Sequence, residues 1–307
     1  MSSEPIVEIY IPFRERISGL RRALKSVQNQ SVERWRVTVA DLTSGQRAKV
    51  AVDALNDPRI TLHNPDTGTE VPGKPPRKPA AYVTEIDENT ELTPDFLKLT
   101  IERLEYQKSD MIIRPQGVYD EEFDKKIPSN KLLAFQFFET RRYDPVELFA
   151  RLLFPGSTYC TLIFRRCSAL MQNTRSNHYA LTPELGHLYR MTQVASPFYF
   201  ESTPLSTRCI PHEKITHSTN IDWNQYTRGW QSVCRHLIST YGEEIISEAY
   251  RVASKTGRME ELEQSLLFAG SYPQKPYVLP LLKRLQFAVK ATFMFRWIHD
   301  PLAKHLN

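Results

Sequence analysis

The sequence predicts an α/β protein, with a mostly parallel sheet flanked by helices and a helical C-terminal extension. Two observations favour this class. Through the first half of the chain, short β-prone apolar runs alternate with amphipathic helical patterns, as in sheets whose parallel strands are connected by helices. From about residue 219 the pattern is almost wholly helical, which predicts one domain over residues 1–218 and an extension over residues 219–307.

The first strand and the first helix have the clearest patterns. Residues 6–11 are nearly all apolar, as expected of a strand buried on both faces, and Pro12 is expected to end it. In the helix that follows, Leu20, Leu24 and Val27 fall on one apolar face. Further strands are expected at 36–41, 59–62, 82–87 and 110–114, further helices at 45–55 and 94–106, and a proline-rich loop at 64–79.

The second half is less regular, and residues 115–143 show no clear period. Asp144 and Pro145 mark a helix start, because aspartate can cap the first turn and proline fits within it. A strand is expected at 158–164 and a helix at 183–193.

The composition is that of an ordinary soluble globular protein, with 41% hydrophobic and 24% charged residues. A net charge of +5 suits an anionic ligand or a membrane surface and does not by itself indicate nucleic acid. The four cysteines form no CxxC pair and have no zinc spacing, so we expect reduced thiols in a cytoplasmic protein. No apolar run is long enough to span a membrane.

The acidic cluster Asp87-Glu88-Asn89 ends the strand expected at 82–87. Oxygen ligands at the carboxyl end of a buried strand suit a hard divalent cation, although a charged surface turn is the alternative for such a triplet. Asp41 ends another expected strand, and parallel strands bring their carboxyl ends to one edge of the sheet. With no GxGxxG or Walker pattern, a nucleotide would be held by such acids together with Mn²⁺ or Mg²⁺ on its phosphates.

Five segments, in this order, resemble family-two GT-A glycosyltransferases. They cover roughly residues 5–220, and the family expectation is a Rossmann-like GT-A domain. Residues 9–44 are similar to the family's first strand, its helix ending in Asn-Gln-Ser and its second strand ending in an acid. Residues 82–96 are similar to the segment with the Asp-x-Asp metal motif. The remaining three segments are 156–166, similar to the strand before the acceptor region, 183–190, similar to the Glu-Asp helix, and 204–212, similar to the closing Pro-Leu-x-x-Tyr-Arg-x-His segment.

The resemblance implies roles for residues of the first half. Pro12 and Arg14 would lie beside the nucleotide, and Asp41 would hydrogen-bond the base. Asp87 would bind the metal and the diphosphate, with Asn89 at the second acidic position of the motif. Asn89 departs from the family's usual aspartate and is a weaker, neutral ligand.

The resemblance also implies roles in the second half. Glu184 stands at the position of the catalytic base, one methylene longer than the usual aspartate, and Arg190 closes the same segment beside the donor. His212, or else His217, would approach the diphosphate or the metal.

Simpler interpretations stay open for several of these residues. Glu184 can be a solvated helix residue, His212 a loop histidine and Asp41 a turn or helix-cap residue. The basic residues Lys74, Arg77 and Lys78 can contact phosphate or belong to a flexible loop.

Residues 277–306 combine large apolar side chains with lysines and arginines. Basic amphipathic helices with aromatic residues can lie in a membrane interface, which would suit a lipid-linked acceptor and a peripheral location on the inner face of the membrane. A helix packed on the catalytic domain is the alternative.

The sequence therefore predicts a metal-dependent, inverting glycosyltransferase, of hexosyl or N-acetylhexosaminyl type. It would use a nucleotide-sugar such as a UDP-sugar and a glycan or lipid-linked acceptor in the synthesis of a cell-surface polysaccharide or glycoconjugate. One alternative is an inactive sugar-nucleotide or glycan-binding module of the same fold. Another is a nucleotidyltransferase, which shares the metal chemistry but would need a basic glycine-rich phosphate loop near the N-terminus.

Overall fold

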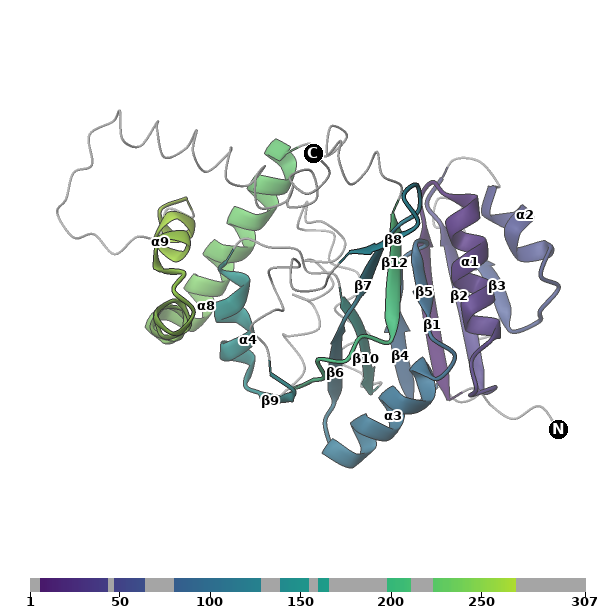
Figure 1. Ribbon diagram of the computed structural model, residues 1–307, viewed down its shortest axis with the longest axis horizontal. Coiled ribbons are helices and arrows are strands. Elements are labelled where there is room, and N and C mark those ends of the chain that lie inside the picture. Colours follow the sequence, from purple (N-terminus) through teal and green to yellow (C-terminus); the bar gives the residue numbers. More distant parts are fainter. Residues whose placement is uncertain are drawn as a thin grey trace. The chain divides into compact units, whose positions relative to one another are not determined.

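The computed structural model describes residues 6–43, 47–63, 80–127, 139–154, 160–165, 198–210 and 223–268 (Figure 1). The chain forms two compact units. The first comprises residues 1–127, 160–171 and 198–210, and the second comprises residues 128–159, 172–197 and 211–307. Each unit draws on several segments of the chain, and the sequence boundary expected after residue 218 stays a prediction.

The main sheet of the first unit is mostly parallel, as predicted. Its strands follow the order β3-β2-β1-β4-β10-β6-β11. Strand β10 runs antiparallel to both of its neighbours, and the other pairs in this series are parallel. The bounds are Val7–Phe13 for β1, Trp35–Asp41 for β2, Ile60–His63 for β3, Tyr82–Glu85 for β4, Met111–Pro115 for β6, Cys160–Arg165 for β10 and Phe198–Phe200 for β11.

Pro12 does not end the first strand, contrary to the prediction, because β1 continues to Phe13. Pairing of β1 with β4 stops at Tyr10, whose carbonyl accepts from the Ile86 N–H at 3.0 Å. Alternate residues of a strand direct their backbone groups to the same side, so position 12 faces the side where β4 pairing has ended. The N–H that proline lacks is therefore not needed there.

A second, smaller sheet has the order β5-β12-β7-β8. Its strands are β5 Thr90–Leu92, β12 Ser206–Ile210, β7 Gly117–Asp120 and β8 Lys125–Ile127. The strand expected at 82–87 ends at Glu85 as β4, and β5 begins three residues after Asp87, so a break divides the two strands. The division follows from Asp87, whose Oδ1 accepts from the Asn89 N–H at 3.0 Å and the Thr90 hydroxyl at 2.7 Å, and so closes a local turn.

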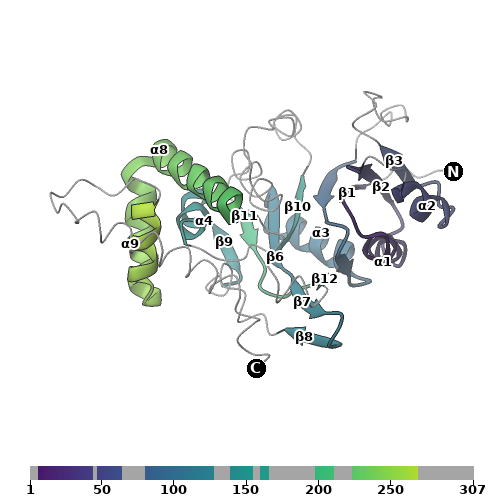
Figure 2. The ribbon, with the colours of Figure 1, turned by 90° about the horizontal axis from the view of Figure 1, so that it is seen from above.

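Three described helices belong to the first unit: α1 Ile17–Gln28, α2 Arg47–Asp53 and α3 Phe96–Gln107. Figures 1 and 2 show α1 and α3 on the same side of the sheet, with α2 beside α1. The apolar face predicted for α1 is confirmed, because Leu20, Leu24 and Val27 are fully buried.

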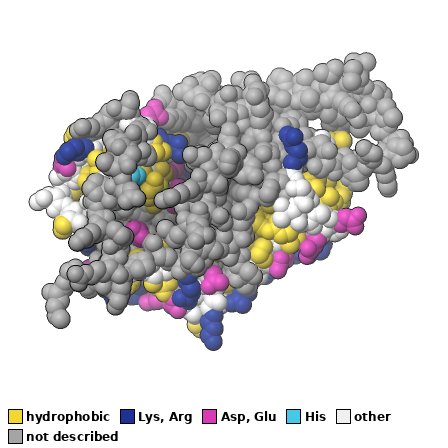
Figure 3. Space-filling model, turned by 180° about the vertical axis from the view of Figure 1, so that it is seen from behind, with side chains coloured by type: hydrophobic (Ala, Val, Ile, Leu, Met, Phe, Trp, Pro, Cys, Tyr) yellow, Lys and Arg dark blue, Asp and Glu magenta, His cyan; other side chains and the backbone are white. Residues whose placement is uncertain are grey.

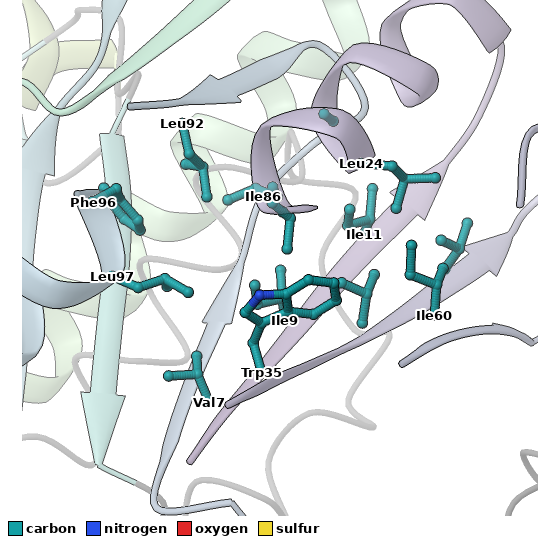
Figure 4. Packing of buried hydrophobic residues seen from close by; sticks show 14 of the residues in the cluster. Val7, Ile9, Ile11, Leu24, Trp35, Ile60, Ile86, Leu92, Phe96 and Leu97 are labelled. Carbon is teal, nitrogen blue, oxygen red and sulfur yellow. The ribbon is translucent and has the colours of Figure 1, made fainter. Parts of the chain in front are cut away.

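The core of the first unit lies between this helix layer and the sheet. Ile9 and Ile11 of β1, Trp35 of β2 and Leu24 of α1 meet there (Figure 4). Full burial of one such side chain contributes about 1.5–3 kcal/mol, so this layer holds the β1–α1–β2 frame in place. That frame positions the carboxyl ends of the strands.

The second unit is largely helical among its described residues, in agreement with the helical extension predicted from residue 219. Helix α4, Pro145–Leu152, begins at the predicted cap, where the Asp144 carboxylate accepts from the Val146 N–H at 2.9 Å. The other described elements are β9 Arg141–Tyr143, α8 Trp223–Thr256 and α9 Met259–Phe268. Within α8 the backbone is non-helical at Gly242, where φ is 58°.

Among the described helices, none combines the length and the apolarity needed to cross a bilayer. The described cysteines Cys160, Cys209 and Cys234 are not joined in disulfides. Acidic and basic side chains of the described surface are interspersed on the face seen in Figure 3. This distribution agrees with the modest net charge.

Candidate functional site: the carboxyl edge of β1, β2 and β4

Strands β1, β2 and β4 end at one edge of the main sheet. Phe13 of β1 is in register with Asp41, and Tyr10 is in register with Glu85, two residues before Asp87. The prediction that Asp41 and Asp87 share this edge is therefore confirmed. Strand β1 lies between them, and the usual strand spacing separates the two strand ends by roughly 10 Å.

Asp87 is held by an ion pair with a residue far away in the sequence. Its Oδ2 lies 2.8 Å from Nη2 of Arg208 in β12, while its Oδ1 closes the turn before β5. The Asp87 side chain is 27% exposed and that of Arg208 is mostly buried. Because the Asp87 carboxylate is partly exposed, it can exchange the Arg208 guanidinium for another cation. Alternatively, Asp87 can hold Arg208 in a position to contact an anion.

Glu88 binds the loop that precedes α1. Its buried carboxylate accepts from the backbone N–H of Arg14 at 2.6 Å, of Glu15 at 3.2 Å and of Arg16 at 2.9 Å. These N–H groups lie at the start of α1, where the helix dipole favours negative charge. Glu88 thus fastens the β1–α1 loop to the acidic turn.

Asn89 is also engaged by the protein. Its Oδ1 accepts from Nη1 of Arg16 at 3.0 Å, and Nη2 of the same guanidinium lies 2.5 Å from Glu121. Glu121 forms a second ion pair with Arg22. Burial alone would raise the pKa of Glu121, but Arg16 and Arg22 together hold that pKa below its usual range.

Asp41 closes the turn after β2. Its Oδ1 accepts from the N–H of Thr43 at 2.9 Å and from its hydroxyl at 2.6 Å, and Oδ2 accepts from the Ala48 N–H at 3.3 Å. The carboxylate is buried, so the turn and helix-cap role left open by the sequence is the one that these contacts describe. Contact of Asp41 with a nucleotide base stays a prediction.

Pro12 and Arg14 lie where the first strand gives way to this loop. Pro12 is buried at the end of β1, and Arg14 is exposed. The Arg14 charge acts on Tyr10: burial raises the pKa of the Tyr10 phenol, Glu85 raises it further, and Arg14 partly offsets both. Arg14 therefore brings positive charge to the same edge as Asp87.

The side chains at this edge can be compared with the oxygen ligands that Mg²⁺ or Mn²⁺ needs. Within the residues that the structure describes, no three His, Cys, Asp or Glu side chains are grouped so as to hold a metal ion. Asp87 supplies one partly exposed carboxylate, and these cations are often held by one or two carboxylates together with substrate phosphates. Asp87 can therefore bind such a cation together with substrate phosphates, provided that Arg208 first moves away from the Asp87 carboxylate.

Several predicted residues lie outside the described part of the chain, namely Glu184, Arg190, His212, His217, Lys74, Arg77, Lys78 and the segment 277–306. Sequence reasoning placed Glu88 in the acidic cluster but gave it no role of its own, and it gave Arg208 no role. Glu88 acts on a loop 72 to 74 positions earlier in the chain, and Arg208 comes from β12, so neither contact leaves a local signal.

Comparison with known proteins places the fold. No family model matches the chain. The structure of S. aureus TarS 1-349 in complex with UDP-GlcNAc matches with a TM-score of 0.52 and 14% identity, over 97% of this chain and 92% of the TarS 1-349 chain. A second structure of TarS 1-349 matches with a TM-score of 0.50 and 12% identity, over 89% of this chain and 93% of the TarS 1-349 chain.

A curated relative gives a sequence match. WcaA of Escherichia coli (strain K12), whose name describes it as a colanic acid biosynthesis glycosyl transferase, is 34% identical over 105 residues. The match spans 32% of this chain and 38% of WcaA, so the chain matches well under half of that relative. The GT-A fold is therefore established by structure, and the predicted resemblance to GT-A glycosyltransferases is confirmed.

Proposed function

We propose that this protein transfers a sugar from a nucleoside-diphosphate sugar to a hydroxyl of a glycan or lipid-linked acceptor, with inversion and with the help of a divalent cation. The observation that carries the proposal is the joining of the β1–α1 loop and the acidic turn through Glu88 at the carboxyl edge of the sheet. Open α/β sheets bind their ligands at such edges. The UDP-GlcNAc complex of TarS supports a uridine donor, and WcaA supports a role in polysaccharide synthesis.

In the proposed reaction, the Glu184 carboxylate removes the proton of the acceptor hydroxyl while that oxygen attacks the anomeric carbon. The bond from the anomeric carbon to the departing diphosphate oxygen breaks, and its electron pair leaves with the nucleoside diphosphate. When bound, Mn²⁺ or Mg²⁺ supplies positive charge to that leaving group. Asp87 would hold the cation and face the diphosphate, and Arg14 and Arg208 would add positive charge nearby.

Turnover of the donor tests this proposal. UDP-GlcNAc and other nucleotide-sugars are incubated with and without Mn²⁺, and release of the nucleoside diphosphate is measured with a mixture of saccharide acceptors. We expect release that depends on Mn²⁺ and is lost in Asp87→Asn and Glu184→Gln, with donor binding retained in Glu184→Gln. Donor binding without turnover under every condition would favour the inactive module of the same fold, and pyrophosphate release from a nucleoside triphosphate would favour a nucleotidyltransferase.

The peripheral membrane location is part of the proposal and has a separate test. If residues 277–307 attach the protein to anionic lipid, their deletion abolishes binding to liposomes while thermal unfolding of the remaining chain stays cooperative. Equal liposome binding of the full and shortened chains contradicts this location and leaves the donor chemistry untouched.

A further inference from the structure

A cavity lies on the α3 side of the first unit. Its volume is about 360 Å³, within the range of small-molecule sites. It is bounded by α3 and by the segment that connects β11 to β12. The lining residues are Leu99, Glu102, Arg103, Tyr106, Arg114, Glu201, Thr203 and Leu205.

Two almost completely buried charged side chains line this cavity. Arg114 is 4% exposed and Glu201 is 6% exposed. Arg114 donates from Nε to the Thr100 hydroxyl at 3.1 Å and from Nη1 to the Thr203 carbonyl at 3.0 Å. The protein thus holds two of the guanidinium nitrogens through these bonds, and Nη2 carries two further N–H donors. Burial lowers the pKa of Arg114 to about 10, which leaves it protonated at neutral pH.

The charges around the cavity balance. Arg103 lies 3.1 Å from Glu201, and Glu102 and Arg114 add one charge of each sign. An anion drawn to the two arginines would also meet the two carboxylates. A neutral ligand with many hydroxyl groups can instead accept from the guanidinium groups and donate to the carboxylates.

The rim is apolar and aromatic. Leu99 and Tyr106 project from α3 seven residues apart, on one face of the helix, and Tyr106 is 79% exposed. An exposed aromatic ring beside a polar cavity offers a stacking surface for an apolar ligand face. We infer that this cavity binds a saccharide unit, with its C–H face on Tyr106 and its hydroxyls toward Arg114 and Glu201.

The cavity is separate from the acidic turn, although both belong to the first unit. Ile113 of β6 and Glu85 of β4 are both in register with Leu162 of β10, which places Arg114 level with Ile86 and two strands away. The two strands are separated by roughly 10 Å at the usual strand spacing. Saccharide binding at this cavity therefore needs neither a donor nor turnover, and it would hold a glycan chain against the first unit.

Saturation-transfer NMR on the full chain tests the inference. The probes are the neutral disaccharides N,N′-diacetylchitobiose and maltose. Excess UDP is present to occupy the proposed nucleotide site at the carboxyl edge of β1, β2 and β4. We expect transfer to the sugar C–H protons in the natural protein and in Tyr106→Phe, which keeps the ring. Tyr106→Ala reduces the transfer by about threefold or more, because the aromatic surface is lost.

Phe123→Ala is the matched control, since Phe123 is another exposed aromatic side chain of the first unit and does not line the cavity. It should leave the transfer unchanged. The inference is overturned if neither disaccharide receives saturation, if Tyr106→Ala behaves like the natural protein, or if added inorganic phosphate abolishes the signal. If the protein does not turn over a nucleotide-sugar, the saturation transfer to the disaccharides is still expected. The proposed glycosyl transfer and the proposed saccharide site can therefore fail separately.

Discussion

Asp87 Oδ2 lies 2.8 Å from Arg208 Nη2, so the carboxylate predicted to bind a metal carries a positively charged partner from its own chain. The pair joins the end of β4 to β12 of the second sheet. A divalent cation at Asp87 has to compete with this guanidinium, whereas a diphosphate can use it. If the proposed cation binds at Asp87, its affinity therefore depends on the Asp87–Arg208 pair as well as on the neutral side chain of Asn89.

Replacing Arg208 should strengthen the binding of free Mn²⁺. In Arg208→Gln the Asp87 carboxylate loses its cationic competitor, and we expect an increase in Mn²⁺ affinity of about tenfold, which corresponds to about 1.4 kcal/mol. Electron paramagnetic resonance of free Mn²⁺ measures this without nucleotide. Asp87→Asn is the control and should weaken binding. Unchanged affinity in both variants would place any metal site elsewhere.

Gly19 allows the first helix to approach the acidic turn. A Cβ at this position would lie 2.7 Å from the Glu88 carbonyl oxygen and 2.9 Å from Asn89 Oδ1. Because the closer neighbour is backbone, Gly19→Ala should displace the turn, cost about 1–3 kcal/mol of unfolding free energy and weaken donor binding.

Gly117→Ala is the matched control for Gly19→Ala. A Cβ at Gly117 would meet its nearest neighbour, Thr207 Oγ1, at 3.5 Å, which is ordinary contact. Chemical denaturation and donor titration measure both variants. Equal effects of the two substitutions would contradict the close approach of α1 to the acidic turn.

Glu88→Gln should destabilise the β1–α1 loop. An amide keeps only one acceptor oxygen and no charge, whereas the carboxylate serves three backbone N–H groups at the start of α1. We expect a loss of about 2–3 kcal/mol, measured by urea denaturation. The exposed Glu91→Gln on β5 is the control and should change the unfolding free energy little. Amide hydrogen exchange at residues 14–16 should be faster in Glu88→Gln and unchanged in Glu91→Gln, which would place the loss of stability in the β1–α1 loop.

The Asp57–Arg59 pair predicts a loss of stability in acid. Hydrogen bonds from the Arg59 side chain lower the pKa of Asp57 from 3.8 to about 2, despite the opposing effect of burial. Because the folded-state pKa is lowered, the stabilisation is complete above about pH 4 and is lost as the pH falls toward 2. Asp57→Asn should cost about 1–2 kcal/mol at neutral pH, a reduced value because the Arg59 side chain is 39% exposed.

Denaturation of the natural protein and Asp57→Asn across this pH range checks the prediction. The difference between the two should shrink below pH 4. A difference that stays constant down to pH 2, or one that grows in acid, would show that the ion pair is not the source of the stabilisation.

Local patterns in the sequence were sufficient to predict the first βαβ unit and the residue that caps α4. Burial of Leu20, Leu24 and Val27 follows from helical periodicity, and Asp144 caps the helix that its neighbour Pro145 begins. The short strands β5, β7 and β8 were not predicted, because three or four residues carry too little periodicity to stand out from a turn. The position of Asp41 and Asp87 at one edge followed from parallel topology alone.

By itself, the sequence determined the alternation of strands and helices and the edge at which the acids of β2 and β4 meet, because hydrophobic periodicity and strand direction are local properties. Only the tertiary structure decided what those acids bind within the protein. Asp87 meets Arg208, Glu88 holds the loop before α1, and Asn89 meets Arg16. Each of these contacts joins residues more than 70 positions apart, and long-range contacts are set by packing between elements rather than by any pattern within one of them.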